Sequence, residues 1–558
     1  LRATPDADGD LSASAPTQAE TNAGVARATG VLALGNIASR VLGLAREIAL
    51  TNLFGASGAV DALKVATTVP TAFYDLLIGG HVNSAIIPIL SEVVTRDGQA
   101  ALWRLVSVLF SLVTVVLAAL VLLLEMFAPQ IVQIAGGAGF DAATQALAAD
   151  LLRLTAPALL FMSLFAVLSG TLYALRVFTF PAFAGAAFNG CIVLVTVLLA
   201  PPPVLTPILD GLSVQWAVAR PPEGIAAAAI GWLVGSLVQL ALQFPGMKRA
   251  RLGLTLNWRH PAIRQIVRLY TPVMFSLVMD TLIIRPFSYN LASRTGEGSI
   301  GYMAWATTLV QFPHGLVATA ISIAILPTLS RQAVITEEGN RAFKDTLGLG
   351  LRLATTLILP ATVGLFVLAT PIIALLFEHG AFVAKDTAMT ALALRLYLFG
   401  LPFATLDLLL VYAFYARQDT VTPALVGLVS LLLYMIVALV LLPRYGLFSL
   451  MIADSAKHML HASLSAFLLQ RRLRGFGGQR LVLTLVKTGL ATLIMGAVAW
   501  AATPLLLQLF PSDGLIHEIA IVGLGGSLSV AVFVGVAALL RIEELRWLAG
   551  LLRRRLLK

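Results

Sequence analysis

Two arginines stand inside a long apolar segment near the start of the chain, in the run SRVLGLARE. Arg40 and Arg46 are six residues apart, so on a helix they point about 120° away from each other. An ionisable side chain inside a membrane is costly and usually has a function. A guanidinium group binds phosphate oxygens through two parallel hydrogen bonds. The pair therefore predicts that this helix lines a wide cavity for an anionic ligand.

Other ionisable residues interrupt the apolar segments that follow. Asp61 and Lys64 are neighbours on one helix face near the start of the second segment, and Arg285 stands beside Pro286 in a later one. Internal ion pairs or extension of the side chain to the membrane surface remain the alternative for each of them. The other candidates of this kind are Asp75, Arg153, Asp280, Arg395, Asp407, Asp454 and Lys457.

The composition is that of an integral membrane protein. Of 558 residues, 58% are hydrophobic and 12% are charged, and the mean hydropathy is +0.90. A soluble chain carries about 25% charged residues, so a soluble enzyme, a disordered protein and a nucleic-acid binder are excluded. The sequence contains no P-loop, no HExxH and no GxSxG motif, and its single cysteine, Cys191, lies in an apolar run. We therefore expect neither enzymatic activity nor a bound cofactor.

Apolar runs long enough to cross a bilayer predict an all-α polytopic membrane protein with fourteen transmembrane helices. Lys and Arg gather in the loops of one side, whereas the other side holds only Arg220, Arg294, Lys385 and Arg444. Basic loops face the cytoplasm, so both termini are predicted to be cytoplasmic, and the basic tail RRRLLK to attract anionic lipids. The runs cover residues 28–53, 60–92, 101–127, 145–173, 179–200, 223–244, 264–292, 300–329, 346–376, 387–415, 420–442, 446–469, 482–508 and 516–540.

An internal repeat divides the chain. AIIPILS (Ala85–Ser91) recurs as AILPTLS (Ala324–Ser330), and YALRVFTFPA (Tyr173–Ala182) recurs as YARQDTVTPA (Tyr415–Ala424), at offsets of 239 and 242. An even number of helices separates the copies, so two six-helix lobes form a parallel pseudo-repeat, a plan typical of transporters. The predicted parts are a disordered tail (1–25), an N-lobe (26–245), a linker (246–263), a C-lobe (264–470), two extra helices (471–541) and a basic tail (542–558).

The second segment contains a predicted hinge at Gly79, Gly80 and His81. Its two prolines, Pro70 and Pro88, are four residues further apart than their counterparts in the second lobe. Glycine in a helix interior costs about 1 kcal/mol relative to alanine, so two in succession favour a bend or an unwound turn. Close packing of helices at small residues is the alternative interpretation.

Several longer motifs resemble the MurJ/MviN family, the lipid II flippases of bacterial peptidoglycan synthesis in the MATE-related exporter superfamily. They are SRVLGLAREIALTNLFGASGAVDAL, PAFAGAAFN, QFPHGLVATAISIAILPTLS, FEHGAF and FYARQDTVTP, and the resemblance covers roughly residues 28–540. It implies two lobes around a V-shaped cavity, a lateral groove for the lipid tail made by the last two helices, and alternating access without ATP.

The resemblance also suggests roles for individual residues. The family's two helix-one arginines correspond to Arg40 and Arg46, its following acid to Glu47, and its helix-two aspartate to Asp61. The sequence departs from the family pattern in three ways: Tyr74 with Asp75 replaces an arginine pair, Gly79 replaces a glutamate, and Thr308 replaces an arginine. Arg285 or Lys64 could supply the missing positive charge. A sodium site would use Asp280 and Asp454, but the helix-eleven ligand it needs is absent.

These observations predict a monomeric flippase in the bacterial plasma membrane that moves lipid II, or a related undecaprenyl-diphosphate-linked saccharide, to the outer leaflet. Its energy would come from a coupling ion or the membrane potential. A flippase for another lipid-linked oligosaccharide and a MATE-like cation-coupled exporter remain alternatives, as does a membrane scaffold that transports nothing. The predicted substrate-binding residues are Arg40, Arg46, Asp61, Lys64, Tyr74, Arg285 and Thr308, and the predicted gate residues are Glu47, Gly79, Gly80 and His81.

Overall fold

The computed structural model describes most of the chain as helices. The described residues are 18–77, 82–202, 223–247, 252–253, 255, 261, 263–264, 278–333, 337–475, 478–510, 514–547 and 550. Within these ranges the structure has no β-strand. A chain that must satisfy its backbone polar groups inside a bilayer meets that demand with helices, so the predicted all-α class is confirmed.

The first half of the described chain forms one layer of helices. In it, α1 packs along α7, α7 along α9, α3 along α6, and α2 along α5. These helices are α1 (Gln18–Phe54), α2 (Gly58–Leu77), α3 (Val82–Met126), α4 (Ala128–Ala135), α5 (Ala142–Thr155), α6 (Ala158–Ala174), α7 (Thr179–Leu199) and α9 (Ala226–Ala241).

The second half forms the other layer. In it, α18 packs along α19, α17 along α19, α12 along α16, and the final pair α20 and α21 packs together and onto α14. The elements are the π-helical turn η4 (Met279–Ile284), α11 (Arg285–Ala292), α12 (Ser299–His314), the π-helical turn η5 (Gly315–Thr319), α13 (Ala320–Gln332), α14 (Glu337–Val367), α15 (Ala369–Phe377), α16 (Ala384–Leu398), α17 (Leu401–Ala416), α18 (Val421–Tyr445), α19 (Phe448–Arg472), α20 (Leu481–Leu509) and α21 (Leu515–Leu539).

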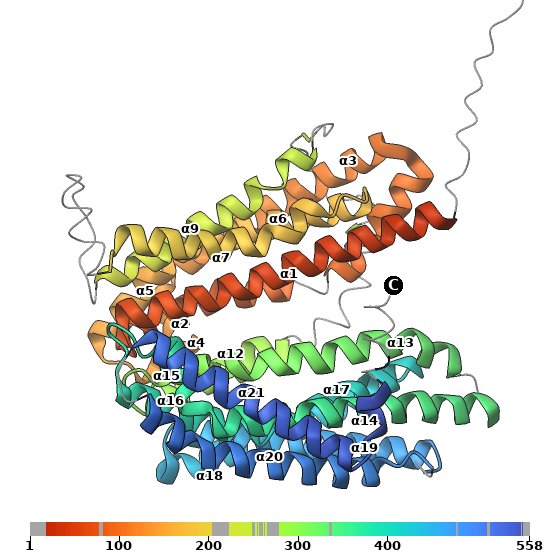
Figure 1. Ribbon diagram of the computed structural model, residues 1–558. Coiled ribbons are helices and arrows are strands. Elements are labelled where there is room, and N and C mark those ends of the chain that lie inside the picture. The colour runs from red at the N-terminus through yellow and green to blue at the C-terminus, as the bar shows by residue number, and fades with distance from the viewer. Residues whose placement is uncertain are drawn as a thin grey trace, which may run out of the picture.

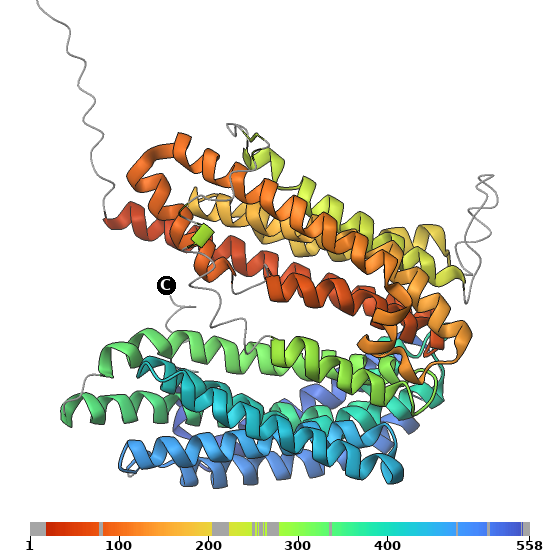
Figure 2. The same cartoon turned by 180° about the vertical axis from the view of Figure 1, so that it is seen from behind.

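The two layers meet at one end and diverge towards the other. Figure 1 shows the end of α1 and the starts of α2 and α16 gathered at the end where the halves touch, while α3 and α13 lie far apart at the opposite end. Figure 2 shows the same divergence from behind. We call these the joined end and the open end. The main hydrophobic core includes Leu50, Val60, Trp305 and Phe377, so residues of both halves build it.

The internal repeat has the same local geometry in both halves. α6 ends at Ala174 and α7 begins at Thr179, and α17 ends at Ala416 and α18 begins at Val421. In each connection the second residue after the helix is left-handed: Arg176 has φ 60° and Gln418 has φ 59°. The two sequences therefore encode the same helix–turn–helix unit twice.

The described helices that are long and apolar enough to cross a membrane number nine, or up to ten if the bent pair α16 and α17 counts as one span. The long helices α1 and α19 are not in this set. Both carry several ionisable residues, among them Arg40, Arg46, Asp454 and His461. The predicted runs at 145–173 and 346–376 are each divided into two helices, at Ala156–Pro157 and at Leu368.

Candidate substrate cavity and the seam that closes it

A cavity of about 220 Å³ lies between the two halves. Its wall comes from α1, α2, α7 and α9 on one side and from α11 and α12 on the other. Among the described residues of this wall, three are cations and one is an acid. The lining residues are Arg46, Glu47, Leu50, Leu63, Lys64, Thr67, Thr68, Thr71, Ile192, Ala228, Trp232, Arg285, Tyr289, Ala304 and Thr308.

The Arg46 guanidinium is held on three sides. One nitrogen donates to Asn189 Oδ1 at 2.9 Å, another donates to Glu47 Oε1 at 2.8 Å, and the group lies 5.2 Å from the centre of the Trp232 ring. Its buried Nε has no hydrogen-bond partner. A guanidinium fixed by its neighbours loses little rotamer freedom when it binds an anion. The Arg46 guanidinium is therefore held in place at the cavity wall by its neighbours.

Glu47 is the buried acid that organises this region. It is 3% exposed, and its carboxylate accepts from Arg46, from Lys64 Nζ at 2.5 Å and from Trp305 Nε1 at 3.1 Å. These partners belong to α1, α2 and α12, so one carboxylate joins both halves. A buried carboxylate needs such partners, because an unpaired charge in the interior is strongly destabilising.

Hydroxyl groups complete the cavity wall. Thr67, Thr71 and Thr308 each donate to the backbone carbonyl four residues earlier in the helix. A hydroxyl oxygen that donates in this way still has lone pairs with which to accept. The cavity thus offers an excess of positive charge together with hydroxyl acceptors, which suits an anionic ligand that also carries hydroxyl or amide donors.

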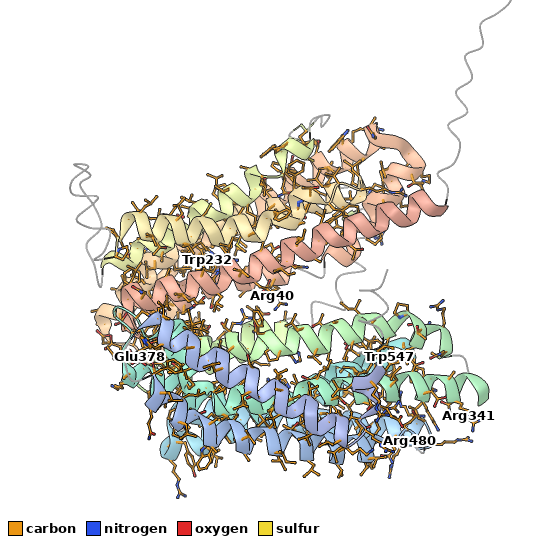
Figure 3. The ribbon with its side chains drawn as sticks, viewed as in Figure 1. Arg40, Trp232, Arg341, Glu378, Arg480 and Trp547 are labelled. Carbon is orange, nitrogen blue, oxygen red and sulfur yellow. The ribbon has the colours of Figure 1, made fainter. Side chains whose placement is uncertain are left out.

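Arg40 lies outside the cavity wall, towards the open end. The distance along the helix explains this, because six residues of α-helix rise about 9 Å. Its side chain is exposed and lies against Gly315 in η5 of the other half: a Cβ on Gly315 would be 2.9 Å from Arg40 Nη2. Figure 3 shows Arg40 between the two layers. The two arginines therefore occupy successive positions along the interface.

The joined end is closed by carboxylates that cap helices of the opposite half. Asp61 of α2 is 1% exposed and accepts from the Gly301 backbone N–H, in the first turn of α12, at 2.8 Å. Glu297, just before α12, accepts from the Gly58 N–H, the first residue of α2, at 2.6 Å. The positive end of a helix dipole favours an anion. The two bonds span 240 and 239 residues, close to the repeat offsets of 239 and 242.

Two glycines bring the backbones of the halves into contact beside these caps. Gly55 and Gly380 have φ values of +60° and +64°, and the Ala381 N–H donates to the Asn52 carbonyl at 2.8 Å. A Cβ on Gly380 would lie 2.3 Å from the Asn52 oxygen, and one on Gly55 would lie 2.5 Å from the Ala381 oxygen. Together with the Asp61–Gly301 and Gly58–Glu297 bonds, we call this set of contacts the seam.

Comparison with known proteins places the chain among membrane transporters. The family described as "Lipid II flippase MurJ" matches residues 50–525. The chain belongs to the MurJ family. It is 31% identical to the lipid II flippase MurJ of Burkholderia cenocepacia over 83% of this chain and 87% of that protein. It is 30% identical to the probable lipid II flippase MurJ of Haemophilus influenzae, over 84% of this chain and 90% of that protein.

Solved structures show the same fold. A lipid II flippase MurJ in an inward closed conformation matches with a TM-score of 0.72 and 24% identity, over 91% of this chain and 98% of that one. An inward-facing multidrug resistance MATE transporter of the MOP superfamily matches with a TM-score of 0.60 and 14% identity, over 78% of this chain and 95% of that one. The MurJ fold therefore accommodates the departures at Tyr74 and Thr308.

Of the predicted site residues, the structure brings together five in the cavity wall: Arg46, Glu47, Lys64, Arg285 and Thr308. Asp61 belongs to the seam, and the partly buried Tyr74 packs against the hydrophobic core, outside the cavity wall. Asp454 is paired with Lys457 at 2.5 Å, and in the described part of the chain no cluster of His, Cys, Asp and Glu could hold a metal ion. Gly79, Gly80, His81 and the Asp280 side chain lie outside the described residues.

Sequence reasoning missed four neighbours of the charged groups: Asn189, Trp232, Glu297 and Trp305. Asn189 is the last residue of the motif PAFAGAAFN, but the sequence does not show that it contacts Arg46. Trp232 and Trp305 stand in apolar helices, where a tryptophan gives no signal of contact with a charge. They join the site because Arg46 and Glu47 of α1 contact Asn189 of α7, Trp232 of α9 and Trp305 of α12.

Proposed function

We propose that this MurJ-family chain moves lipid II from the cytoplasmic to the outer leaflet of the bacterial plasma membrane, as a transporter that makes and breaks no covalent bond. The central observation is the cavity at the interface of the halves, whose described wall residues include the cations Arg46, Lys64 and Arg285 and one acid, Glu47. A diphosphate placed there would meet fixed cations. The names of its relatives in the MurJ family support the choice of lipid II.

The proposed orientation follows from the distribution of basic residues. Figure 3 shows Arg341 and Arg480 at the open end and Glu378 at the joined end. Under the positive-inside rule the open end faces the cytoplasm and the seam faces outwards. Alternating access would then require the seam to part while the open end closes. Both termini would be cytoplasmic, and the protein would act as a monomer.

The proposed place for the lipid tail is the surface formed by the last two helices. α20 and α21 pack against each other and along α14, and they expose large apolar residues such as Leu493, Trp500 and Val530. A polyprenyl chain needs an apolar surface that leads away from the polar cavity. In this proposal residues 471–541 form a functional unit separate from the lobes at 26–245 and 264–470. Residues 542–558 form a tail that contacts anionic lipids.

The test is replacement of the host flippase by this chain. Cells depleted of their own lipid II flippase should grow when they express it, and labelling from outside should show lipid II in the outer leaflet. Reconstituted vesicles that contain only this chain and lipid II should show the same movement. If outer-leaflet lipid II stays unchanged on depletion and the vesicles show no movement, the proposal is wrong.

A second candidate is transport of another lipid-linked oligosaccharide. The cavity has Thr308 where the MurJ resemblance implies an arginine, and Thr67, Thr68 and Thr71 add hydroxyls to the wall. Loss of capsule or surface glycan without lysis on depletion would favour this candidate. A MATE-like exporter of organic cations is disfavoured, because a cationic ligand would meet an excess of like charge.

A further inference from the structure

A histidine and an aspartate form a partly buried pair inside the second half, away from the cavity. His461 Nδ1 of α19 lies 2.6 Å from Asp407 Oδ1 of α17, and the two side chains are 16% and 14% exposed. The Ser465 hydroxyl lies 3.4 Å from the same histidine nitrogen. In such a pair the imidazole donates its Nδ1–H to the carboxylate. The pair belongs neither to the described cavity wall nor to the seam.

Titratable groups from neighbouring helices surround the pair. His314, the last residue of α12, has its Nδ1 3.5 Å from the Thr405 hydroxyl on α17 and interacts electrostatically with Asp407. His458 on α19 also interacts electrostatically with Asp407 and lies 3.7 Å from Asp454. Further groups are Tyr415 on α17, which interacts with Asp407, and Lys457, which is bonded to Asp454.

The matching position in the first half is apolar. At the repeat offset of 242, Asp407 corresponds to Phe165 of α6. The two helices are otherwise alike in bounds and in their following turn. The helix–turn–helix unit therefore forms without a carboxylate at this place. Burying an ion pair stabilises a fold little or not at all relative to apolar side chains of similar volume. A structural requirement does not explain why the charge is there.

The pair is connected to the interface between the halves through α12, whose last residue, His314, interacts with Asp407. This helix begins at the seam, where the Gly301 N–H binds Asp61, and carries the cavity residue Thr308. It ends at His314, after which the π-helical turn η5 places Gly315 against Arg40 of the other half. Isolated π-helical turns occur often at functional sites. A change of charge beside His314 thus acts on the helix that contacts the first half at both of its ends.

We propose that Asp407 and His461 form a proton-binding site whose occupancy is coupled to lipid translocation, so that the proton is the coupling ion. With neutral imidazole and ionised carboxylate the pair has a net charge of −1. One proton taken up at the imidazole converts it to a neutral ion pair, with no other bond made or broken. The neutral form costs less at this partly buried position. This inference rests on the proposed function, and the experiments below separate the two.

The first experiment uses vesicles that contain the full chain and a fluorescent lipid II, with a gradient of one pH unit across the membrane. If one proton moves with each lipid, the ratio of lipid II between the leaflets should shift by about tenfold. Asp407→Asn and His461→Gln should abolish the shift. Asp150→Asn, which changes an exposed carboxylate beside Arg153, should keep it. If lipid II moves between the leaflets but its ratio does not respond to the gradient, or if Asp407→Asn shows a normal shift, the proposal is overturned.

The second experiment contains no lipid II and so does not depend on the proposed function. In a Cys191→Ser background, spin labels at Leu34→Cys on α1 and Ile323→Cys on α13, both exposed, report the distance between the halves. The distribution of distances should change with pH in the otherwise unaltered protein and stay fixed in Asp407→Asn. If lipid II never moves but the distances respond to pH in this way, the proposed substrate is wrong and the proton site stands. If the distances do not respond to pH, the proton site is wrong.

Discussion

The seam and the cavity join the same two halves with different chemistry. At the seam, carboxylates bind backbone N–H groups and glycines let main chains touch, as at Asp61–Gly301 and Gly380–Asn52. In the cavity, the side chains of Arg46, Lys64 and Glu47 meet one another. Main-chain contacts depend on the position of whole helices, whereas long side chains adapt individually. The seam therefore suits a gate with two states, and the cavity suits a ligand that arrives and leaves.

The comparison also shows how the pseudo-repeat is used. Each half supplies one carboxylate to the seam, and each carboxylate bond joins two positions about one repeat length apart. In the cavity, Glu47 from the first half binds Trp305 from the second. Both halves therefore contribute carboxylates to the seam, whereas Glu47, the buried acid of the cavity wall, belongs to the first half.

The largest effect is expected from Glu47→Gln, because this change leaves Arg46 and Lys64 without their buried counter-charge. Removal of one partner of a buried pair costs about 3–5 kcal/mol. The apparent melting temperature of the purified protein should fall clearly. Glu92→Gln, an exposed carboxylate paired with Arg96, is the matched control and should leave it unchanged. Equal melting temperatures for the two variants would show that Glu47 does not organise the cavity.

Arg46→Ala should abolish complementation of a flippase-depleted strain while the protein still inserts in the membrane. A hydrogen bond to a charged group contributes about 1.5–3 kcal/mol, so substrate engagement should fall about ten- to hundredfold. Arg46→Lys should restore only part of the activity, since an ammonium cannot form the two-pronged contact. Arg153→Ala serves as the exposed control. Normal growth with Arg46→Ala at native expression would remove Arg46 from the site.

Gly380→Ala should loosen the seam and leave the cavity intact. A left-handed residue with a Cβ costs about 1–2 kcal/mol, and the new atom would also overlap the Asn52 carbonyl oxygen. An impermeant maleimide should label Ala56→Cys, which adjoins the seam, faster in this variant. Gly364→Ala, at a glycine of α14 with open space around it, should not change the labelling rate. If both variants label alike, Gly380 is not part of the gate.

Asp61→Asn should loosen the seam less than Gly380→Ala. The amide oxygen still accepts from the Gly301 N–H, but the variant loses the negative charge at the start of α12. That interaction contributes about 0.3–1 kcal/mol at a helix terminus. Labelling of Ala56→Cys should rise modestly, with Asp150→Asn as the control. A larger rise than in Gly380→Ala would reverse the proposed order of the seam contacts.

Sequence patterns predicted the helical architecture because membrane burial leaves few choices. Hydrophobic runs gave most helix bounds within a few residues: the run 179–200 became α7 at Thr179–Leu199, and 516–540 became α21 at Leu515–Leu539. Runs that contain a break were predicted less well, as at Pro157, where one run became two helices. A break changes the direction of a helix without changing the mean hydropathy of the segment.

Residues of the candidate site could be predicted where a charged side chain stands in an apolar segment. Arg46, Lys64 and Arg285 stand out in apolar segments, and the structure places all three in one cavity wall. His461 beside Asp407 was missed, since the two residues lie in different helices and a lone histidine carries little information. Glu297 was missed because a glutamate in a loop is common, and the sequence does not show that it accepts from the Gly58 N–H.

The sequence by itself determined the all-α membrane class, the internal repeat and the small set of charged residues that membrane segments rarely contain. Each of these is a property of one residue or one segment, and the cost of burying polar groups in a bilayer makes it visible. Only the tertiary structure decided that Arg46 lines the cavity while Arg40 lies against Gly315, and that Asp61 binds a helix end instead of lining the cavity. The reason is that a side chain's partner depends on which helix packs opposite it, and local sequence does not contain that information.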